Sequence, residues 1–177
     1  RMFRALADAH VNIHAITTSQ IKISALVERP QGMEALRAVH DEFELEKPPQ
    51  SRASFGEGAT KVERPSPVDV VSRLQRMEDL TIDDIRLDQT QGRVTISQLP
   101  DRPGIAAEIF EAVAAENLLV DMIVQGAGRD GLANLSFTVP RESVGKAVEV
   151  AKGISAEFGC GPVSSDPTID ILSVYGV

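Results

Sequence analysis

The chain has 177 residues, of which 42% are hydrophobic and 25% charged, and its formal net charge at pH 7 is -8. This composition describes a globular protein with apolar surface for one or two cores, and it excludes a disordered chain. An acidic chain without a basic cluster is unsuited to nucleic acid, whose phosphates require positive charge. No apolar run approaches the ~18 residues that cross a bilayer and no signal segment opens the chain, so we expect no membrane partner and a cytoplasmic location. The single Cys160 permits no internal disulfide.

The first 46 residues predict helix, strand, strand, helix. Phe3, Leu6 and Ala7 share one helix face, and the residues that follow alternate between apolar and polar. The predicted elements are a helix already under way at residue 1, strands at 11–16 and 21–27 joined by a polar hairpin at 17–20, and a helix at 33–43. We interpret residues 1–46 as a module that lacks its first strand.

Residues 47–78 form a predicted linker, because proline and glycine are spread among polar residues there, and a short helix is predicted at 68–77. Residues 79–166 are predicted to form a complete module. Its elements are strands at 80–87 and 94–99, a helix at 104–117, strands at 119–125 and 132–139 around a loop at 126–131, a helix at 142–158 and a short strand at 161–164. From residue 94 the order is βαββαβ, the ferredoxin-like plan. The strand at 169–175, within a final segment 167–177, is expected to begin a further module or to complete the module of residues 1–46.

An internal repeat supports this organisation. Residues 3–18 overlay residues 110–125 at a constant offset of 107 residues without a gap. Phe3 aligns with Phe110, while His14 aligns with Asp121 and Thr18 with Gln125. The two copies therefore share apolar positions and differ at polar positions where a ligand would be recognised.

The stretch after residue 99 carries the features of a small-ligand site. Pro103 and Gly104 predict a helix start whose free N–H groups and positive dipole end favour a carboxylate. Asp121 and Gln125, four residues apart on a strand, share one face, and Asp121 could hold an ammonium group. A free amino acid offers both charges. The residues alone also fit an ordinary helix start and a solvated turn aspartate.

Two motifs resemble a known family. The run Val94-Thr-Ile-Ser-Gln-Leu-Pro-Asp-Arg-Pro-Gly-Ile-Ala-Ala-Glu-Ile-Phe, followed by Val120-Asp-Met-Ile-Val-Gln, is similar to the first regulatory ACT module of aspartate kinase. The run Met2-Phe-Arg-Ala-Leu-Ala, followed by Val11-Asn-Ile-His-Ala-Ile-Thr-Thr-Ser-Gln-Ile-Lys-Ile-Ser, is similar to the second such module. The resemblance covers most of the chain apart from residues about 48 to 78.

The resemblance implies an α+β fold of tandem ferredoxin-like ACT modules with antiparallel sheets, as in family members with two or four such modules. It further implies a regulatory region that binds lysine and/or threonine for feedback control, pairs with other ACT modules and serves a kinase domain elsewhere. The expected effector-binding residues are Asp101, Gly104, Ile105, Ala106, Val120, Asp121, Gln125, Asn12, Ile13, Thr17 and Thr18.

The resemblance places ATP and Mg in the kinase domain, so we expect no cofactor, catalytic residue or metal site in this region. The three histidines, His10, His14 and His40, have no potential metal-ligand partners at a suitable spacing in the sequence, so we expect them to be ordinary surface or edge residues. A stand-alone amino-acid-binding or protein-interaction ACT protein without a kinase remains the alternative. An enzyme in its own right is disfavoured, because no acid and base groups are paired in the sequence.

Overall fold

The computed structural model describes residues 1–19, 22–47 and 82–176, which fall into two units. The predicted linker from residue 48 onward and the predicted helix at 68–77 lie outside the described residues. The first unit contains residues 1–46 and 89–170, and the second contains the described strands 82–88 and 171–176. Within the described ranges, no helix has both the length and the apolar character needed to span a bilayer.

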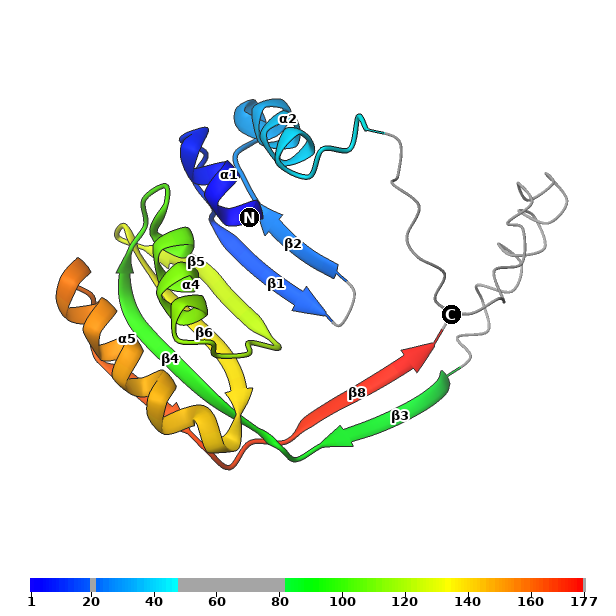
Figure 1. Ribbon diagram of the computed structural model, residues 1–177, viewed down its shortest axis with the longest axis vertical. Coiled ribbons are helices and arrows are strands. Elements are labelled where there is room, and N and C mark those ends of the chain that lie inside the picture. The colour runs from blue at the N-terminus through cyan, green and yellow to red at the C-terminus, as the bar shows by residue number, and fades with distance from the viewer. Residues whose placement is uncertain (20–21, 48–81, 177) are drawn as a thin grey trace, which may run out of the picture. The chain divides into compact units, whose positions relative to one another are not determined.

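The first unit is a helix layer on a single antiparallel sheet (Figure 1). Its elements in chain order are α1 (Met2–Asp8), β1 (Ala15–Ser19), β2 (Lys22–Leu26), α2 (Gly32–Glu42), β4 (Gln91–Pro100), α4 (Ile105–Ala115), β5 (Ile123–Arg129), β6 (Leu132–Pro140), α5 (Val144–Phe158) and β7 (Val163–Asp166). Short 3-10 turns at Arg29–Gln31 and Arg141–Ser143 precede α2 and α5.

The sheet has the strand order β2-β1-β5-β6-β4-β7. The four strands β7-β4-β6-β5 are those of one ferredoxin-like module, with the first strand β4 between the third strand β6 and the last strand β7. The hairpin β1–β2 extends this sheet, because β1 pairs with β5 through Ile16↔Gln125 and Thr17↔Val124. We call residues 1–46 the half-module, since they supply α1, β1, β2 and α2 only.

The core lies between the helices and the inner face of the sheet. Strand residues Val94, Ile96 and Phe137 are at most 1% exposed, as is Ile109 of α4. Ile16 of the half-module belongs to the same cluster and is fully buried. The apolar alternation of the strands therefore builds one core that continues across the β1–β5 junction.

The internal repeat appears in the structure as two matching halves. His10 and Asn117, 107 residues apart, both follow a helix and both have a positive φ, 53° and 54°. The N–H of each donates to the corresponding carbonyl, His10 to Ala7 and Asn117 to Ala114. Phe3 stacks on Phe110 with ring centroids 5.3 Å apart, so equivalent positions meet across the junction of the two halves.

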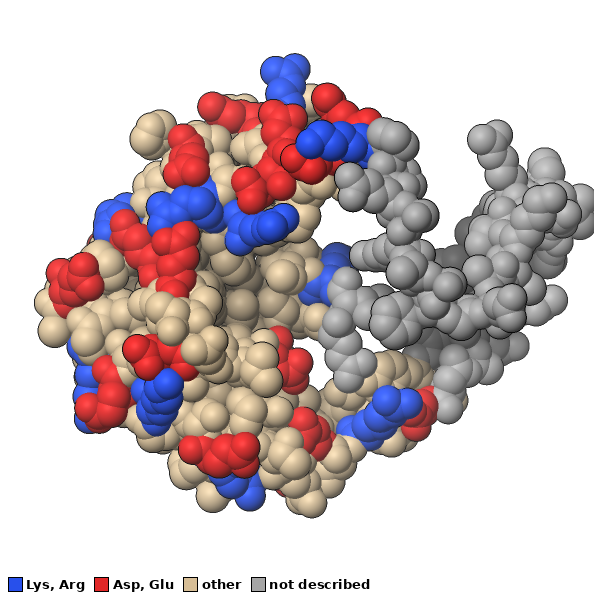
Figure 2. Space-filling model, in the orientation of Figure 1, with Lys and Arg blue, Asp and Glu red and all other residues tan. Residues whose placement is uncertain are grey.

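Arg4 and Glu111 form an ion pair at this junction, and Arg4 Nε donates to Glu111 Oε1 at 2.6 Å. These two residues are equivalent positions of the repeat as well. Acidic and basic side chains are interspersed on the face shown in Figure 2.

Two strand predictions are wrong by about four residues, in the same direction in both halves. β1 begins at Ala15 and includes the predicted hairpin residues Thr17 to Ser19, and β5 begins at Ile123 and runs through the predicted glycine loop to Arg129. The apolar residues that suggested earlier strands, such as Val11, fill the core from a loop: Val11 is 1% exposed, but its N–H donates to Leu6 O at the end of α1. An alternation of apolar residues in the sequence indicates which residues contact the core, but it does not show that they hydrogen-bond to a neighbouring strand.

The second unit is a two-stranded antiparallel ribbon of β3 (Ile82–Asp88) and β8 (Ile171–Gly176). The structure pairs the strand predicted at 169–175 with β3; the prediction left open whether this strand begins a further module or completes the module of residues 1–46. Four aliphatic side chains share one face of the ribbon and are 57–65% exposed: Ile85, Leu87, Leu172 and Val174. On the other face, Arg86 lies over the Tyr175 ring at 5.1 Å.

Candidate functional site

A small pocket lies where the half-module meets the start of α4. The half-module contributes an aromatic ring, aliphatic side chains and one amide, and the complete module contributes the first turn of α4 and a buried glutamine. The lining residues are Phe3, Ala7, Val11, Asn12, Ile13, Arg102, Gly104, Ile105, Ala106, Ala107 and Gln125. The cavity volume is about 10 Å³, close to the space of a single water molecule. A larger ligand therefore requires the walls to move outward.

Gly104 shapes the mouth of this pocket. It is the N-cap of α4 with a positive φ of 91°, a conformation that glycine adopts without the clash that a Cβ introduces. The first N–H groups of a helix have no intrahelical partner, and Ile105, Ala106 and Ala107 carry those of α4. The helix start thus offers the pocket backbone donors and the positive end of a dipole, as the sequence predicts.

Gln125 supplies an acceptor inside the pocket. Its side chain is 3% exposed, and its Nε2 donates to Ile13 O at 3.0 Å across the β1–β5 junction. Among the described residues, none donates a hydrogen bond to Gln125 Oε1. An unpaired buried acceptor costs about 1–3 kcal/mol, so this atom favours a ligand that brings an N–H or O–H group.

Charged side chains from both halves meet beside the pocket. Asn12 Nδ2 donates to Asp101 Oδ1 at 2.8 Å, which joins the loop before β1 to the loop before α4. His14 lies between two carboxylates, with Nδ1 3.9 Å from Asp101 Oδ2 and Nε2 3.6 Å from Glu28 Oε1. Asp101 is the more enclosed carboxylate, since its side chain is 17% exposed.

The structure divides the sequence-predicted site residues into three groups. Six of them line the pocket: Asn12, Ile13, Gly104, Ile105, Ala106 and Gln125. Asp101 lies next to it through its bond to Asn12.

The other four do not line the pocket. Thr18 Oγ1 accepts the Ile123 N–H at 2.7 Å, and Thr17 is exposed opposite Ser24 and Val124. Val120 is half-buried and Asp121 is exposed. The repeat aligns these last two residues with Ile13 and His14, so they occupy the matching place in the other half.

Sequence reasoning missed Arg102 and the apolar wall of Phe3, Ala7 and Val11. Arg102 Nη2 donates to Glu108 Oε2 at 2.7 Å, and its guanidinium lies over the Phe158 ring at 5.5 Å. A cation two residues before a helix start was a visible signal for an anion site. The apolar wall carried no such signal, because its residues are ordinary helix and core residues until tertiary packing brings them to α4.

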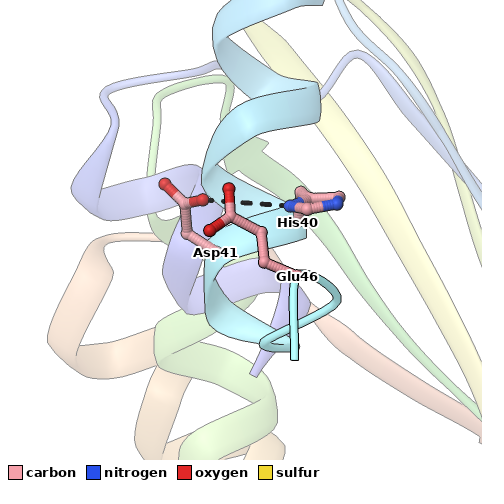
Figure 3. Close-up of side chains that lie close together, drawn as sticks. All are labelled: His40, Asp41 and Glu46. Carbon is pink, nitrogen blue, oxygen red and sulfur yellow. Dashed lines mark ion pairs between the residues drawn. The ribbon is translucent and has the colours of Figure 1, made fainter. Parts of the chain in front are cut away.

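A second cluster lies at the end of α2. His40, Asp41 and Glu46 each direct one potential ligand atom into a region where these atoms lie within 4.8 Å of one another (Figure 3). Glu44, with a positive φ of 52°, turns the chain after α2 so that Glu46 returns beside His40. Sequence spacing alone did not suggest this proximity. Asp41 and Glu46 are exposed, and such carboxylates are common on protein surfaces, so the cluster carries no functional argument here.

A family model described as ACT domain matches residues 1–43 and 94–153. An aspartate kinase of Stutzerimonas stutzeri (strain A1501) is 32% identical over 142 residues, which are 80% of this chain and 33% of that protein. An aspartokinase of Helicobacter pylori (strain ATCC 700392 / 26695) is 40% identical over 103 residues, 58% of this chain and 25% of the relative. The chain thus spans about a quarter to a third of the length of these relatives.

The solved structures that match this chain are also aspartate kinases or their regulatory subunits. A crystal structure of aspartate kinase from Synechocystis matches with TM-score 0.74 and 25% identity, over 99% of this chain and 27% of that one. The regulatory subunit of aspartate kinase from Thermus flavus matches with TM-score 0.51 and 34% identity, over 54% of this chain and 63% of that one. The chain belongs to the ACT domain family, and the part of that family it matches is the regulatory region of aspartate kinases.

Proposed function

We propose that this chain is the effector-binding regulatory part of an aspartate kinase, and that the pocket between the half-module and α4 binds lysine or threonine for feedback control. The proposal rests on the pocket itself, which combines backbone N–H groups at the start of α4 with the buried Gln125 Oε1, an atom that accepts no hydrogen bond from the described residues. A free amino acid supplies the matching carboxylate and a hydrogen-bond donor.

The regulatory mechanism follows from where the pocket lies. Its walls come from both halves, so a ligand that contacts Asn12 and Ile13 on one side and α4 on the other binds best when the halves are docked. Ligand binding would then favour the docked arrangement by the difference in affinity, typically ~1 to 3 kcal/mol. The catalytic domain, with its ATP and Mg, and the association of subunits through ACT modules in the cytoplasm belong to this proposal too.

Calorimetric titration with L-lysine, L-threonine and L-methionine tests the proposal. We expect saturable binding of lysine or threonine, and about 10-fold weaker binding by Gln125→Leu, which removes the buried acceptor. Gln31→Leu is the matched control, because Gln31 Nε2 also donates to a backbone carbonyl, that of His10 at 3.3 Å, and Gln31 does not line the pocket. Absence of binding by the unaltered chain would contradict the proposed function.

Asp121→Asn tests the sequence-based role of Asp121 as the ammonium partner separately. Asp121 is exposed and does not line the pocket, so this role rests on the sequence pattern and on the resemblance. A loss of about 10-fold in affinity would assign the ammonium to that carboxylate, in line with a lost charge-assisted bond. Unchanged affinity would remove Asp121 from the site.

A further inference from the structure

Arg102 is the cation that lines the pocket, and it is engaged by a neighbour of its own chain. Its Nη2 donates to Glu108 Oε2 at 2.7 Å, while Nη1 donates to Pro103 O at 3.3 Å. Both charged side chains are partly enclosed, with 43% of Arg102 and 32% of Glu108 exposed. A charge-assisted bond of this kind has full strength only while no other anion competes for the guanidinium.

Glu108 lies beside the Gly104 end of the pocket, although it is not one of the residues that line it. A Cβ built on Gly104 would lie 4.0 Å from Glu108 Oε1, 4.0 Å from Arg102 Nη1 and 3.7 Å from the Ala7 Cβ. The carboxylate therefore lies at the start of α4, within the region where the helix dipole favours negative charge. A ligand carboxylate that entered the pocket would meet the same helix start and the same guanidinium.

Binding of an amino acid requires this arrangement to change. The pocket volume of about 10 Å³ holds one water molecule, and an amino acid is several times larger. Arg102 lines the pocket with a side chain that is 43% exposed, whereas the deeper wall is made of buried core residues such as Ile105 and Gln125. The Arg102 side of the pocket is thus the part that can open without disturbing the core.

We propose that the Arg102–Glu108 ion pair is a competitive latch: the effector carboxylate displaces Glu108 from Arg102, which then serves as the carboxylate anchor of the site. This inference rests on the proposed function and adds the residue that binds the ligand carboxylate and the residue that opposes it. Arg102 keeps its position during the exchange, because its contact with the Phe158 ring does not involve Glu108. One carboxylate replaces another, so the charge paired with Arg102 is conserved.

Two substitutions with opposite expected effects test the latch. Arg102→Gln removes the anchor and is expected to weaken binding of the effector about 10-fold or more. Glu108→Gln removes the competing charge while keeping the side-chain size, and is expected to strengthen binding about 3- to 10-fold. The ligand is L-threonine or L-lysine, whichever the unaltered chain binds, measured by calorimetry at low salt.

Two controls separate the latch from general charge effects. Glu116→Gln makes the same charge change at the other end of α4, where Glu116 pairs with Lys146, and it should leave the affinity within about twofold. The amide of the same amino acid lacks the carboxylate, so Glu108→Gln should not strengthen its binding. Thermal unfolding of each ligand-free variant confirms that it is folded.

The outcomes are distinct. Unchanged or weaker binding by Glu108→Gln would overturn the latch and would mean that Glu108 supports the site, for example by holding the ligand ammonium. Unchanged binding by Arg102→Gln would overturn the anchor. If the unaltered chain binds no amino acid, both the proposed function and the latch are wrong. If the unaltered chain binds the effector but neither Arg102→Gln nor Glu108→Gln changes the affinity, only the latch is wrong.

Discussion

At the scale of single residues, backbone conformation and one unpartnered atom define the candidate site. Gly104 holds a left-handed conformation at the mouth, and Gln125 presents an acceptor that no described donor satisfies. The Pro-Gly pair predicted the helix start. The predicted strand face shared by Asp121 and Gln125 is wrong, because β5 begins at Ile123, so that Asp121 is exposed before the strand while Gln125 is buried within it. Gln125 Nε2 donates to the carbonyl oxygen of Ile13, which is 112 residues away in the sequence. This tertiary contact leaves Oε1 as the atom of the amide without a partner, which the sequence could not predict.

Gly104→Ala is expected to destabilise the first unit by about 1–2 kcal/mol, the cost of a left-handed conformation for a residue with a Cβ. Steric contact is not the cause, because the added Cβ meets its nearest neighbour, the Ala7 Cβ, at an ordinary 3.7 Å. The matched control is Gly153→Ala in α5, where no atom lies within 4 Å of the added Cβ and the free energy of unfolding should rise by about 0.5–1 kcal/mol. Urea unfolding measures both; equal shifts would contradict the role assigned to φ.

At the scale of elements, the junction between the half-module and the complete module is stabilised by contacts between equivalent positions of the repeat. Phe3 stacks on Phe110, Arg4 pairs with Glu111, and only a short stretch of β1 pairs with β5. Hydrogen bonding to the Arg4 guanidinium holds the pKa of Glu111 below its ordinary value. The junction thus combines an apolar contact that pH does not change with an ion pair that acid removes.

Arg4→Gln is expected to lower stability at pH 7, and its effect is expected to shrink in acid. The folded-state pKa of Glu111 is depressed. The stability that the ion pair contributes is therefore fully present above the pKa of an unfolded glutamate, about 4.3, and is lost as pH falls through the lower folded-state pKa. Both side chains are largely exposed, so the effect at neutral pH will be small and will decrease with salt. Urea unfolding over a series of pH values measures it, and an effect that stays constant from neutral pH into acid would argue against the ion pair.

At the scale of the whole molecule, the described chain consists of a six-stranded unit with a continuous core and a separate two-stranded ribbon. The ribbon shows four exposed aliphatic side chains on one face and has a cation over an aromatic ring on the other. A two-stranded ribbon is marginally stable by itself. The two units should therefore differ strongly in local stability.

Hydrogen exchange is expected to show this difference. Backbone amides of β4 and β6, at the centre of the large sheet, should exchange slowly, and those of β3 and β8 should exchange close to the rate of free peptide. Leu99→Ala, at a site that is 1% exposed, should cost about 2–5 kcal/mol and speed exchange in the six-stranded unit while leaving the ribbon unchanged. Parallel changes in both units would show that they unfold as one.

The sequence by itself determined the fold class, the helices and the repeat, because apolar periodicity and an ungapped offset of 107 residues are local properties of the chain. Turn chemistry in the sequence also predicted the helix start at Gly104. Tertiary structure alone decided which strands pair: β1 with β5, and β8 with β3. Strand pairing depends on which sheet edges come together in space, and a strand with a given apolar alternation could hydrogen-bond to any of several neighbouring strands. For the same reason only the folded chain brings Phe3, Ala7 and Val11 to α4 and makes a pocket of what the sequence shows as a helix start.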